Sequence, residues 1–155
     1  MKNKNNFQRK GSKSNASVGK EFERTAKKYF LRKENIKLSE NFSINIGISN
    51  VKKEHCFDLG IKNSITKILV ECKSHKWTEG GNIPSAKLTV WNEAMYYFLL
   101  SPNNFKKIFF ILRDYSKKRK ETLGVYYLRR YSHLIPSNVK FYEYDEESNK
   151  VKVLN

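Results

Sequence analysis

Acidic and basic side chains lie close together in two neighbouring segments that otherwise consist of strand-forming apolar residues. Asp58 lies in the first segment, and Glu71 and Lys73 flank Cys72 in the second. In a strand, alternate side chains point to the same face, so Glu71 and Lys73 share one side of a sheet. Short charged side chains are unexpected among Ile, Leu and Val unless they serve a site. We therefore expect Asp58, Glu71 and Lys73 to converge if the two segments pair as strands.

A cluster of this composition favours a bound cation. Two carboxylates about 4 Å apart repel by roughly 4 kcal/mol at an effective dielectric near 20. One lysine cannot neutralise two or three acids, and Glu23, on a predicted helix, is a candidate third. Oxygen ligands favour Mg²⁺ or Mn²⁺ over zinc, and the backbone carbonyl of Cys72 is a further candidate ligand.

Each of these residues also has a purely structural interpretation. Asp58 could simply mark the end of a strand, because aspartate is common in turns. Glu71 and Lys73 could form an exposed pair that contributes little to stability. Glu23 could pair with Lys27, four positions later on the same helix.

The elements that must position these residues follow from hydrophobic periodicity. Apolar side chains repeat every four residues after Ser17, which predicts a helix over 17–34 with Ser17 as its N-cap. Strict alternation places Phe57 and Leu59 on one face of the second strand and Asp58 on the other. Three strands are expected after the helix, over about 42–48, 56–61 and 66–73.

The rest of the chain continues the pattern of an α/β domain. We expect a helix capped by Ser85, a central strand, a third helix and two final strands, over about 85–99, 108–112, 121–134, 139–144 and 151–154. This order predicts a mixed sheet with helices on both faces, a three-layer α/β fold in one domain over 17–155. Residues 1–16 lack periodicity and predict a basic, disordered arm.

The charge balance predicts a polyanionic partner. The chain has 31 Lys and Arg against 15 Asp and Glu, a net charge of +16. The N-terminal arm lacks an apolar face, so nucleic acid ranks above a membrane surface. The densest basic run could contact DNA phosphates, although a solvated surface is the alternative; it consists of Lys117, Lys118, Arg119 and Lys120.

Length and composition exclude several other classes. A chain of 155 residues suits one domain, and its longest apolar run, Ala94 to Leu100, is too short to span a bilayer. The first residues lack a signal peptide, so a cytoplasmic location is expected. Cys56 and Cys72 cannot form a disulfide framework or a four-thiolate zinc site, and are expected to be reduced core thiols.

Aromatic and histidine residues flank the acidic cluster. His55 has no partner at metal-ligand spacing and is expected to be structural. His75 and Trp77 follow the third strand and could contact DNA, although an ordinary loop accounts for them equally well.

Asp58, a twelve-residue spacer and Glu71-Cys72-Lys73 resemble the motif of the PD-(D/E)XK nuclease superfamily, whose fold is called restriction-endonuclease-like. The segment from Gly19 to Ala26 resembles the opening helix of many members, in which a Gly-x-x-x-Glu pattern contributes an acid, here Glu23. Phe57 replaces the proline that often precedes the aspartate. The resemblance covers about 18–112 and implies a helix, a three-stranded meander, a second helix and a further strand.

The resemblance also implies a function, a Mg²⁺-dependent DNA endonuclease of the restriction, repair or junction-resolving type. Asp58 and Glu71 would hold the metal, with Glu23 acting directly or through water, and Lys73 would position or activate the attacking water. Lys87 lies where members place a supporting Lys or Gln, although an exposed lysine is equally expected there. A homodimer is expected, because cutting both strands needs two sites. The alternatives are a non-catalytic nucleic-acid-binding domain of the same fold and a basic RNA- or ribosome-associated protein.

Overall fold

The computed structural model describes residues 14–155, which form three α-helices, one short 3₁₀ helix and eight strands. In chain order these are α1 (Asn15–Lys33), β1 (Ser39–Ile46), β2 (Lys53–Lys62), β3 (Lys67–Lys73), α2 (Ser85–Leu100), β4 (Lys106–Leu112), β5 (Tyr115–Ser116), β6 (Glu121–Thr122), α3 (Leu123–Tyr131), η1 (Ser132–Leu134), β7 (Val139–Asp145) and β8 (Lys150–Val153).

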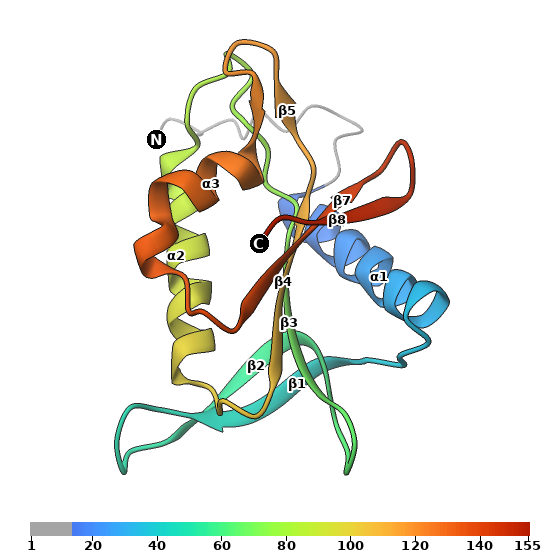
Figure 1. Ribbon diagram of the computed structural model, residues 1–155, viewed down its shortest axis with the longest axis vertical. Coiled ribbons are helices and arrows are strands. Elements are labelled where there is room, and N and C mark those ends of the chain that lie inside the picture. The colour runs from blue at the N-terminus through green and yellow to red at the C-terminus, as the bar shows by residue number, and fades with distance from the viewer. Residues whose placement is uncertain (1–13) are drawn as a thin grey trace, which may run out of the picture.

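Six strands form one mixed sheet in the order β1-β2-β3-β4-β7-β8. The first three form an antiparallel meander, β3, β4 and β7 run parallel, and β8 returns antiparallel. Helix α1 covers one face of the sheet, and α2 and α3 cover the other (Figure 1). The predicted α/β class, with a mixed sheet between helices, is confirmed.

Apolar side chains form two cores, one on each face of the sheet. Phe22 and Phe30 of α1 belong to the first core, and α2 and α3 supply the second. Strand β4 contributes alternate side chains to both: Phe110 joins the first core, and Phe109 and Ile111 join the second. A strand buried on both sides explains the continuous apolar run in this part of the sequence.

The two long helices begin differently from the prediction. Ser14, not Ser17, caps α1, because its hydroxyl accepts a hydrogen bond from the Ser17 N–H at 3.2 Å. The extra turn adds a backbone bond from Val18 to Ser14 at 3.1 Å, which favours the earlier serine. Ser85 is the first residue of α2 rather than its cap, since Pro84 precedes it without a side-chain bond. The predicted arm lies outside the described residues except for 14–16, which cap and begin α1.

Strand β2 changes face at Asp58, against the prediction. Phe57 packs in the core beside α2, whereas Leu59 packs in the core beside α1. Strict alternation would place both on one face. The facing residue of β1, Asn41, has a left-handed φ of 51°, and the β1–β2 register is the same on both sides of it. The local twist at this point therefore places Asp58 at the boundary between the two cores.

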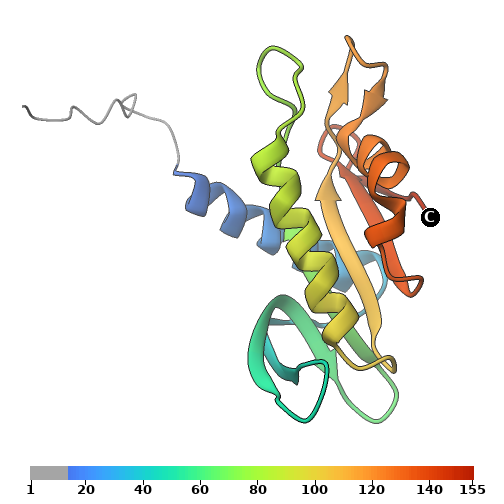
Figure 2. The same ribbon diagram turned by 90° about the vertical axis from the view of Figure 1, so that its left-hand side faces the viewer.

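The C-terminal half follows the predicted order with one addition. Of the residues predicted as a helix over 121–134, those from 123 onward form α3 and η1, whereas Glu121–Thr122 form β6 and pair with β5 in a two-stranded hairpin (Figure 2), so the predicted start of the helix is wrong. Strands of two residues carry no periodicity, so the sequence pattern did not indicate this hairpin. In the described part of the chain, no helix is both long enough and apolar enough to cross a lipid bilayer.

Candidate active site

The pairing of β2 with β3 ends one residue before the predicted cluster. Its last pair joins Leu59 to Val70, so Asp58 and Glu71 lie just beyond the paired region. The Asp58 Oδ2 atom accepts a hydrogen bond from the backbone N–H of Cys72 at 2.7 Å. A side-chain carboxylate therefore occupies the place of the next backbone acceptor and is held between the two strands.

Lys73 connects the two carboxylates that the sequence predicted to converge. Its Nζ lies 2.8 Å from Glu71 Oε2 and 3.7 Å from Asp58 Oδ2. All three side chains are largely withdrawn from solvent, with exposed fractions of 8% for Glu71, 17% for Lys73 and 23% for Asp58. The structure therefore brings Asp58, Glu71 and Lys73 together at one point.

The charges in this cluster are only partly balanced. Burial, and then the charge of Glu71, raise the pKa of Asp58 to about 6, although Lys73 opposes this. Burial also acts to raise the pKa of Glu71, but His55 and Lys73 outweigh it and the pKa falls below its usual range. Burial disfavours the Lys73 ammonium, yet the two carboxylates raise its pKa. Lys73 is therefore charged at neutral pH, and Asp58 carries the uncompensated charge.

Glu23 reaches the same site from α1, but its carboxylate is paired with Lys20. Lys20 Nζ donates to Glu23 Oε2 at 2.6 Å, whereas Lys27 contacts Glu40 at 2.9 Å instead of Glu23. Gly19, one turn before Glu23, has open space around it, because a Cβ there would meet no atom within 4 Å. The missing side chain leaves the space beside Glu23 open.

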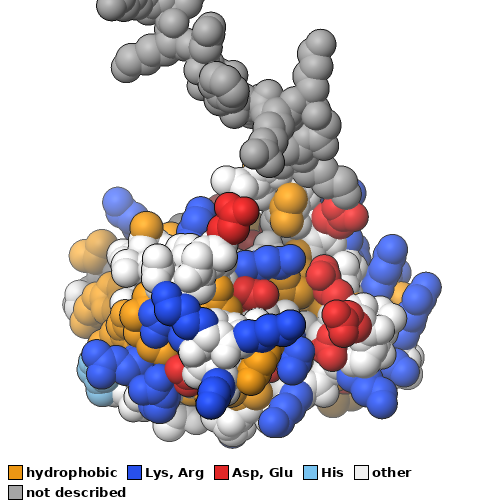
Figure 3. Space-filling view, turned by 90° about the horizontal axis from the view of Figure 1, so that it is seen from above, with side chains coloured by type: hydrophobic (Ala, Val, Ile, Leu, Met, Phe, Trp, Pro, Cys, Tyr) orange, Lys and Arg blue, Asp and Glu red, His pale blue; other side chains and the backbone are white. Residues whose placement is uncertain are grey.

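A cavity of about 680 Å³ opens beside the cluster. The start of α1, the end of β3 with the loop after it, and the start of α2 form its walls. Its charged lining residues are Lys20, Glu23, Asp58, Lys73, Lys76 and Lys87. Lys and Arg side chains surround a smaller number of acidic ones on this side of the molecule (Figure 3). The predicted residue Lys87 therefore lies at the site, and Glu71, the most buried of the three acids in the cluster, is not among the residues that line the cavity.

The donor atoms of this site suit a hard cation, but they are not assembled as a metal site. Asp58 Oδ1 has no hydrogen-bond partner among residues 14–155, since the bonds of this carboxylate use Oδ2. Glu71 and Glu23 each form an ion pair with a lysine. Within residues 14–155, no three His, Cys, Asp or Glu side chains are grouped to hold a metal. Asp58 and Glu71 could hold a cation once the Lys73 ammonium moves away from their carboxylates. The identity of the cation, Mg²⁺ or Mn²⁺, and the Cys72 carbonyl as a ligand stay predictions.

His55 is closer to the cluster than its place in the sequence indicated. Its Nε2 atom is buried, has no hydrogen-bond partner in the described part of the chain, and lies 3.7 Å from Glu71 Oε1. That separation is too long for a hydrogen bond. The ring stacks on Tyr97 with centroids 3.8 Å apart. Sequence spacing missed this neighbour because the contact joins residues far apart in the chain, beyond the paired part of β2 and β3.

The basic run predicted to contact DNA lies at the turn between β5 and β6, next to the loop over 74–84 (Figure 2). Arg119 turns inward, because its Nε donates to the Gly81 carbonyl at 2.9 Å and its guanidinium lies 5.2 Å above the Trp77 ring. The other three residues of the run are exposed: Lys117, Lys118 and Lys120. Lys118 Nζ also contacts the Gly80 carbonyl and Asn82 Oδ1, each at 3.4 Å, so Arg119 and Lys118 both join the hairpin to the loop, and Lys117 and Lys120 form the rest of the exposed basic surface.

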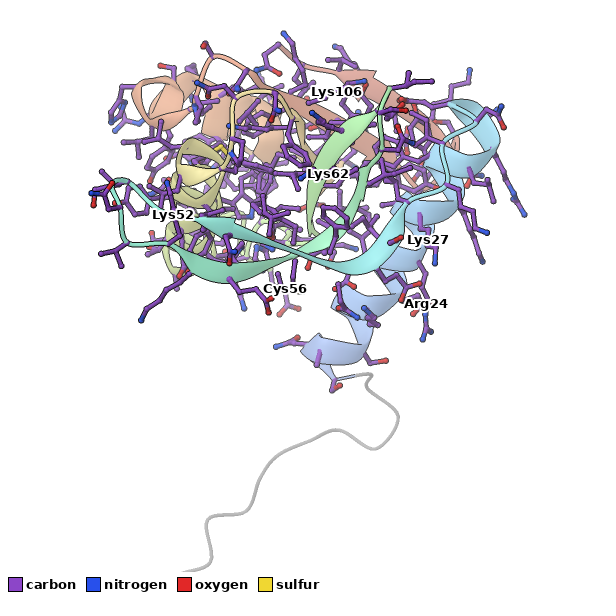
Figure 4. All side chains as sticks on the ribbon, turned by 90° about the horizontal axis from the view of Figure 1, so that it is seen from below. Arg24, Lys27, Lys52, Cys56, Lys62 and Lys106 are labelled. Carbon is purple, nitrogen blue, oxygen red and sulfur yellow. The ribbon has the colours of Figure 1, made fainter. Side chains whose placement is uncertain are left out.

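Trp77 and the two cysteines have structural surroundings. Trp77 is buried, and its backbone and indole N–H groups donate to Asp114 Oδ2 and to the Asp114 carbonyl at 2.7 and 3.0 Å, so its surroundings are those of the ordinary loop. Burial raises the pKa of the Cys72 thiol well above its usual range, as expected of a core thiol. Cys56 is exposed on the outer side of the meander, so its predicted core position is wrong (Figure 4).

Comparisons with known proteins leave the family open. No protein-family model matches the chain. No curated protein matches it. No solved structure matches it either. The cluster of Asp58, Glu71 and Lys73 and the cavity beside it are therefore the features that indicate a function.

Proposed function

We propose that this protein is a metal-dependent DNA endonuclease with a restriction-endonuclease-like fold. One observation carries the proposal: Asp58, Glu71 and Lys73 meet where the pairing of β2 with β3 ends, beside a cavity lined by lysines. The order of a helix, a three-stranded meander, a helix and a parallel strand supports the fold. The net charge of +16 supports a polyanionic substrate.

In this proposal Asp58 and Glu71 hold the metal, with Glu23 reaching it after release from Lys20. Mg²⁺ held by these carboxylates would supply Lewis acidity, which would activate a water and offset charge on the phosphate. Lys73 is held as an ammonium by its two carboxylate neighbours, which favours an electrostatic role over that of a base. Its charge orients the attacking water and offsets the negative charge that develops on the phosphate oxygens.

The overall reaction is a hydrolysis and needs only water as co-reactant. The water oxygen forms a bond to phosphorus while one bond between phosphorus and a sugar oxygen breaks. The leaving oxygen takes up a proton, and the proton lost by the water passes to solvent. The chain contributes position and charge to this step, which are the main sources of catalysis in phosphate chemistry.

The basic surface continues from the cavity to the β5–β6 hairpin. Lys76 lines both the cavity beside Asp58 and a second depression of about 470 Å³ below the hairpin, which Lys117 and Lys118 also line. Lys87 borders the first cavity. A DNA strand whose phosphate enters the cavity could therefore follow these lysines.

Cleavage assays on supercoiled, linear and branched DNA test the proposal. We expect strand breaks with Mg²⁺ or Mn²⁺ and none after chelation. Lys73→Met keeps the length of the side chain but removes the charge, so it should be inactive yet folded. Lys67→Met, at the opposite end of β3, is the matched control and should cut normally. Wild-type protein that cuts no better than Lys73→Met would contradict the proposal.

A non-catalytic DNA-binding domain is the second candidate, and one observation favours it. Lysines already contact both Glu71 and Glu23, so these acids are neutralised without a metal. Calorimetric titration with Mg²⁺ or Mn²⁺ separates the two functions, because a binding domain has no need to take up the cation. DNA affinity that is independent of metal, with no heat of metal binding, would favour this second function.

The hairpin lysines should strengthen DNA binding through phosphate contacts. We expect Lys117→Gln combined with Lys120→Gln to weaken binding and to lower the slope of log affinity against log salt by up to about 2, since each phosphate contact contributes roughly 0.9. Fluorescence anisotropy with a DNA duplex, in Ca²⁺ and between about 50 and 200 mM salt, measures this slope.

The matched control for this experiment is the double variant Lys53→Gln and Lys62→Gln. Both lysines are exposed and lie outside the cavity lining, Lys62 on the underside of the molecule (Figure 4). The change in net charge is the same in both double variants. Equal losses of affinity and slope in the two would show that total charge, not the hairpin, governs binding.

A further inference from the structure

His75 lies in the wall of the cavity, two residues after Lys73. Its Nδ1 atom accepts a hydrogen bond from the indole N–H of Trp91 at 2.8 Å, and the two rings are nearly parallel, with an interplanar angle of 20°. Trp91 is fully buried in α2 and packs against Phe109 and Tyr127. Because the donor is fixed by packing, the imidazole ring of His75 has a defined orientation.

The same hydrogen bond determines which ring nitrogen carries the proton. An indole N–H group can only donate, so Nδ1 of His75 must be the accepting, unprotonated nitrogen. In a neutral imidazole the proton then resides on Nε2. Within residues 14–155 this Nε2 has no hydrogen-bond partner, and the ring borders the cavity. His75 therefore offers a free N–H donor beside Asp58 and Lys73.

The surroundings of His75 keep this donor uncharged. Burial, and then the positive charges of Lys87 and Lys73, lower the pKa of His75 to about 4. Protonation would also place a hydrogen on Nδ1, which would break the bond from Trp91. Two of the ammonium groups in the cavity, those of Lys20 and Lys73, are already bound to carboxylates. His75 thus differs from the lysine donors that line the cavity, because its availability does not depend on charge.

We propose that the Nε2–H group of His75 donates a hydrogen bond to a non-bridging oxygen of the phosphodiester substrate, and that Trp91 is the positioning residue that fixes the His75 tautomer. This inference rests on the proposed function, since it places the phosphate in the cavity beside Asp58. A neutral donor can contact a phosphate oxygen next to a divalent cation without adding repulsion between like charges. Because Nε2 carries a proton, it is a donor and not a metal ligand.

Kinetic comparison of variants at His75 tests the role in cleavage. His75→Phe keeps an aromatic ring but has no donor, and its single-turnover cleavage rate should fall by about 10²-fold, as for other donors to a reacting oxyanion. His75→Gln retains one amide donor and one acceptor and should recover part of that loss. His133→Gln, at an exposed histidine in η1, should leave the rate unchanged. Thermal melting confirms that each variant is folded.

Nitrogen-15 NMR on the full chain provides a readout that does not depend on cleavage. The wild-type His75 signals should show the Nε2–H tautomer at neutral pH, and Trp91→Phe should show a mixture of tautomers. Addition of a DNA duplex in Ca²⁺ should shift the Nε2 proton resonance downfield when it donates to a phosphate oxygen. Trp91→Phe should also slow cleavage while leaving DNA affinity within about threefold of wild type.

The outcomes separate the inference from the function on which it rests. If wild type cuts DNA and His75→Phe cuts at the same rate, the role of His75 is wrong and the nuclease function stands. If wild type binds DNA without cutting it, the nuclease function is wrong, and the shift of the Nε2 proton still decides whether His75 contacts phosphate. A Nδ1–H tautomer, or no shift with DNA, would overturn the inference in either case.

Discussion

Asp58→Asn should abolish metal-dependent cleavage and at the same time raise the melting temperature of the protein. The amide removes a metal ligand but can still accept the hydrogen bond that the Cys72 N–H now donates to Asp58 at 2.7 Å. It also removes a charge that the folded state disfavours, because burial and Glu71 raise the pKa of Asp58 to about 6. Loss of activity together with a gain of stability is typical of a site that retains an unfavourable charge for its function.

The sign of the stability change follows from the direction of the pKa shift. A carboxyl group with a raised pKa binds its proton more tightly in the folded state, so stability declines as pH rises from the unfolded value of 3.8 to about 6. A rise of this size corresponds to at most about 3 kcal/mol above pH 6, and partial solvent exposure reduces it. We expect a gain of about 1–2 kcal/mol at pH 7.5, or roughly 3–6 °C.

Thermal melts of metal-free protein between pH 4 and pH 8 measure this difference. The gap in melting temperature between Asp58→Asn and wild type should open as pH rises through about 6. Asp145→Asn is the control, because backbone N–H of Glu147 and the Ser148 hydroxyl lower the pKa of Asp145, and its neutralisation should not stabilise the fold. A less stable Asp58→Asn at pH 7.5 would show that Lys73 fully compensates the carboxylate charge.

The sequence pattern predicted the parts of the fold that depend on local periodicity. Alternation and apolar runs located the meander, the central strand β4 and the helices, because burial of one face imposes the same spacing wherever an element lies. The shared face of Glu71 and Lys73 follows from the same rule. Their proximity to Asp58 also required β2 and β3 to pair, which a short connection between consecutive strands favours.

The remaining features depend on contacts between residues distant in sequence. The change of face at Asp58 accompanies a left-handed residue, Asn41, in the adjacent strand. His55 lies beside Glu71 beyond the paired part of β2 and β3, and Arg119 turns inward because loop 74–84 offers it a carbonyl and the Trp77 ring. None of these partners is indicated by spacing along the chain. Within the same basic run, Arg119 is therefore structural, whereas Lys117 and Lys120 are exposed to solvent.

Lys107 is a buried lysine that the sequence pattern did not distinguish from its exposed neighbour, and we expect a large loss of stability when it is replaced. It is 1% exposed, whereas its neighbour Lys106 lies at the surface against Tyr142. Lys107 Nζ donates to the carbonyls of Phe98 at 2.6 Å and Ser101 at 3.1 Å, at the C-terminal end of α2. Burial lowers the pKa of Lys107, but the negative end of a helix dipole favours its ammonium form.

Lys107→Ala should lower the free energy of unfolding by about 4 kcal/mol, because it leaves a cavity and removes the ammonium donor from two helix carbonyls. For a chain of this size the melting temperature should fall by about 10 °C. Lys107→Met restores most of the volume but no donor, so we expect it to recover only about half of the loss. Lys106→Ala, at the surface, should change stability by less than about 1 kcal/mol.

Urea denaturation of the three variants decides which term dominates at this buried ammonium. Two hydrogen bonds from a charged donor to carbonyls contribute about 1.5–3 kcal/mol each, whereas withdrawing the ammonium from water costs several kcal/mol. Phe98 retains a second donor without Lys107, since the Ser101 hydroxyl also contacts its carbonyl at 2.7 Å. In Lys107→Met, the loss of hydrogen-bond energy should therefore arise mainly at the Ser101 carbonyl. A Lys107→Met variant as stable as wild type would mean that desolvation of the ammonium cancels what its hydrogen bonds contribute.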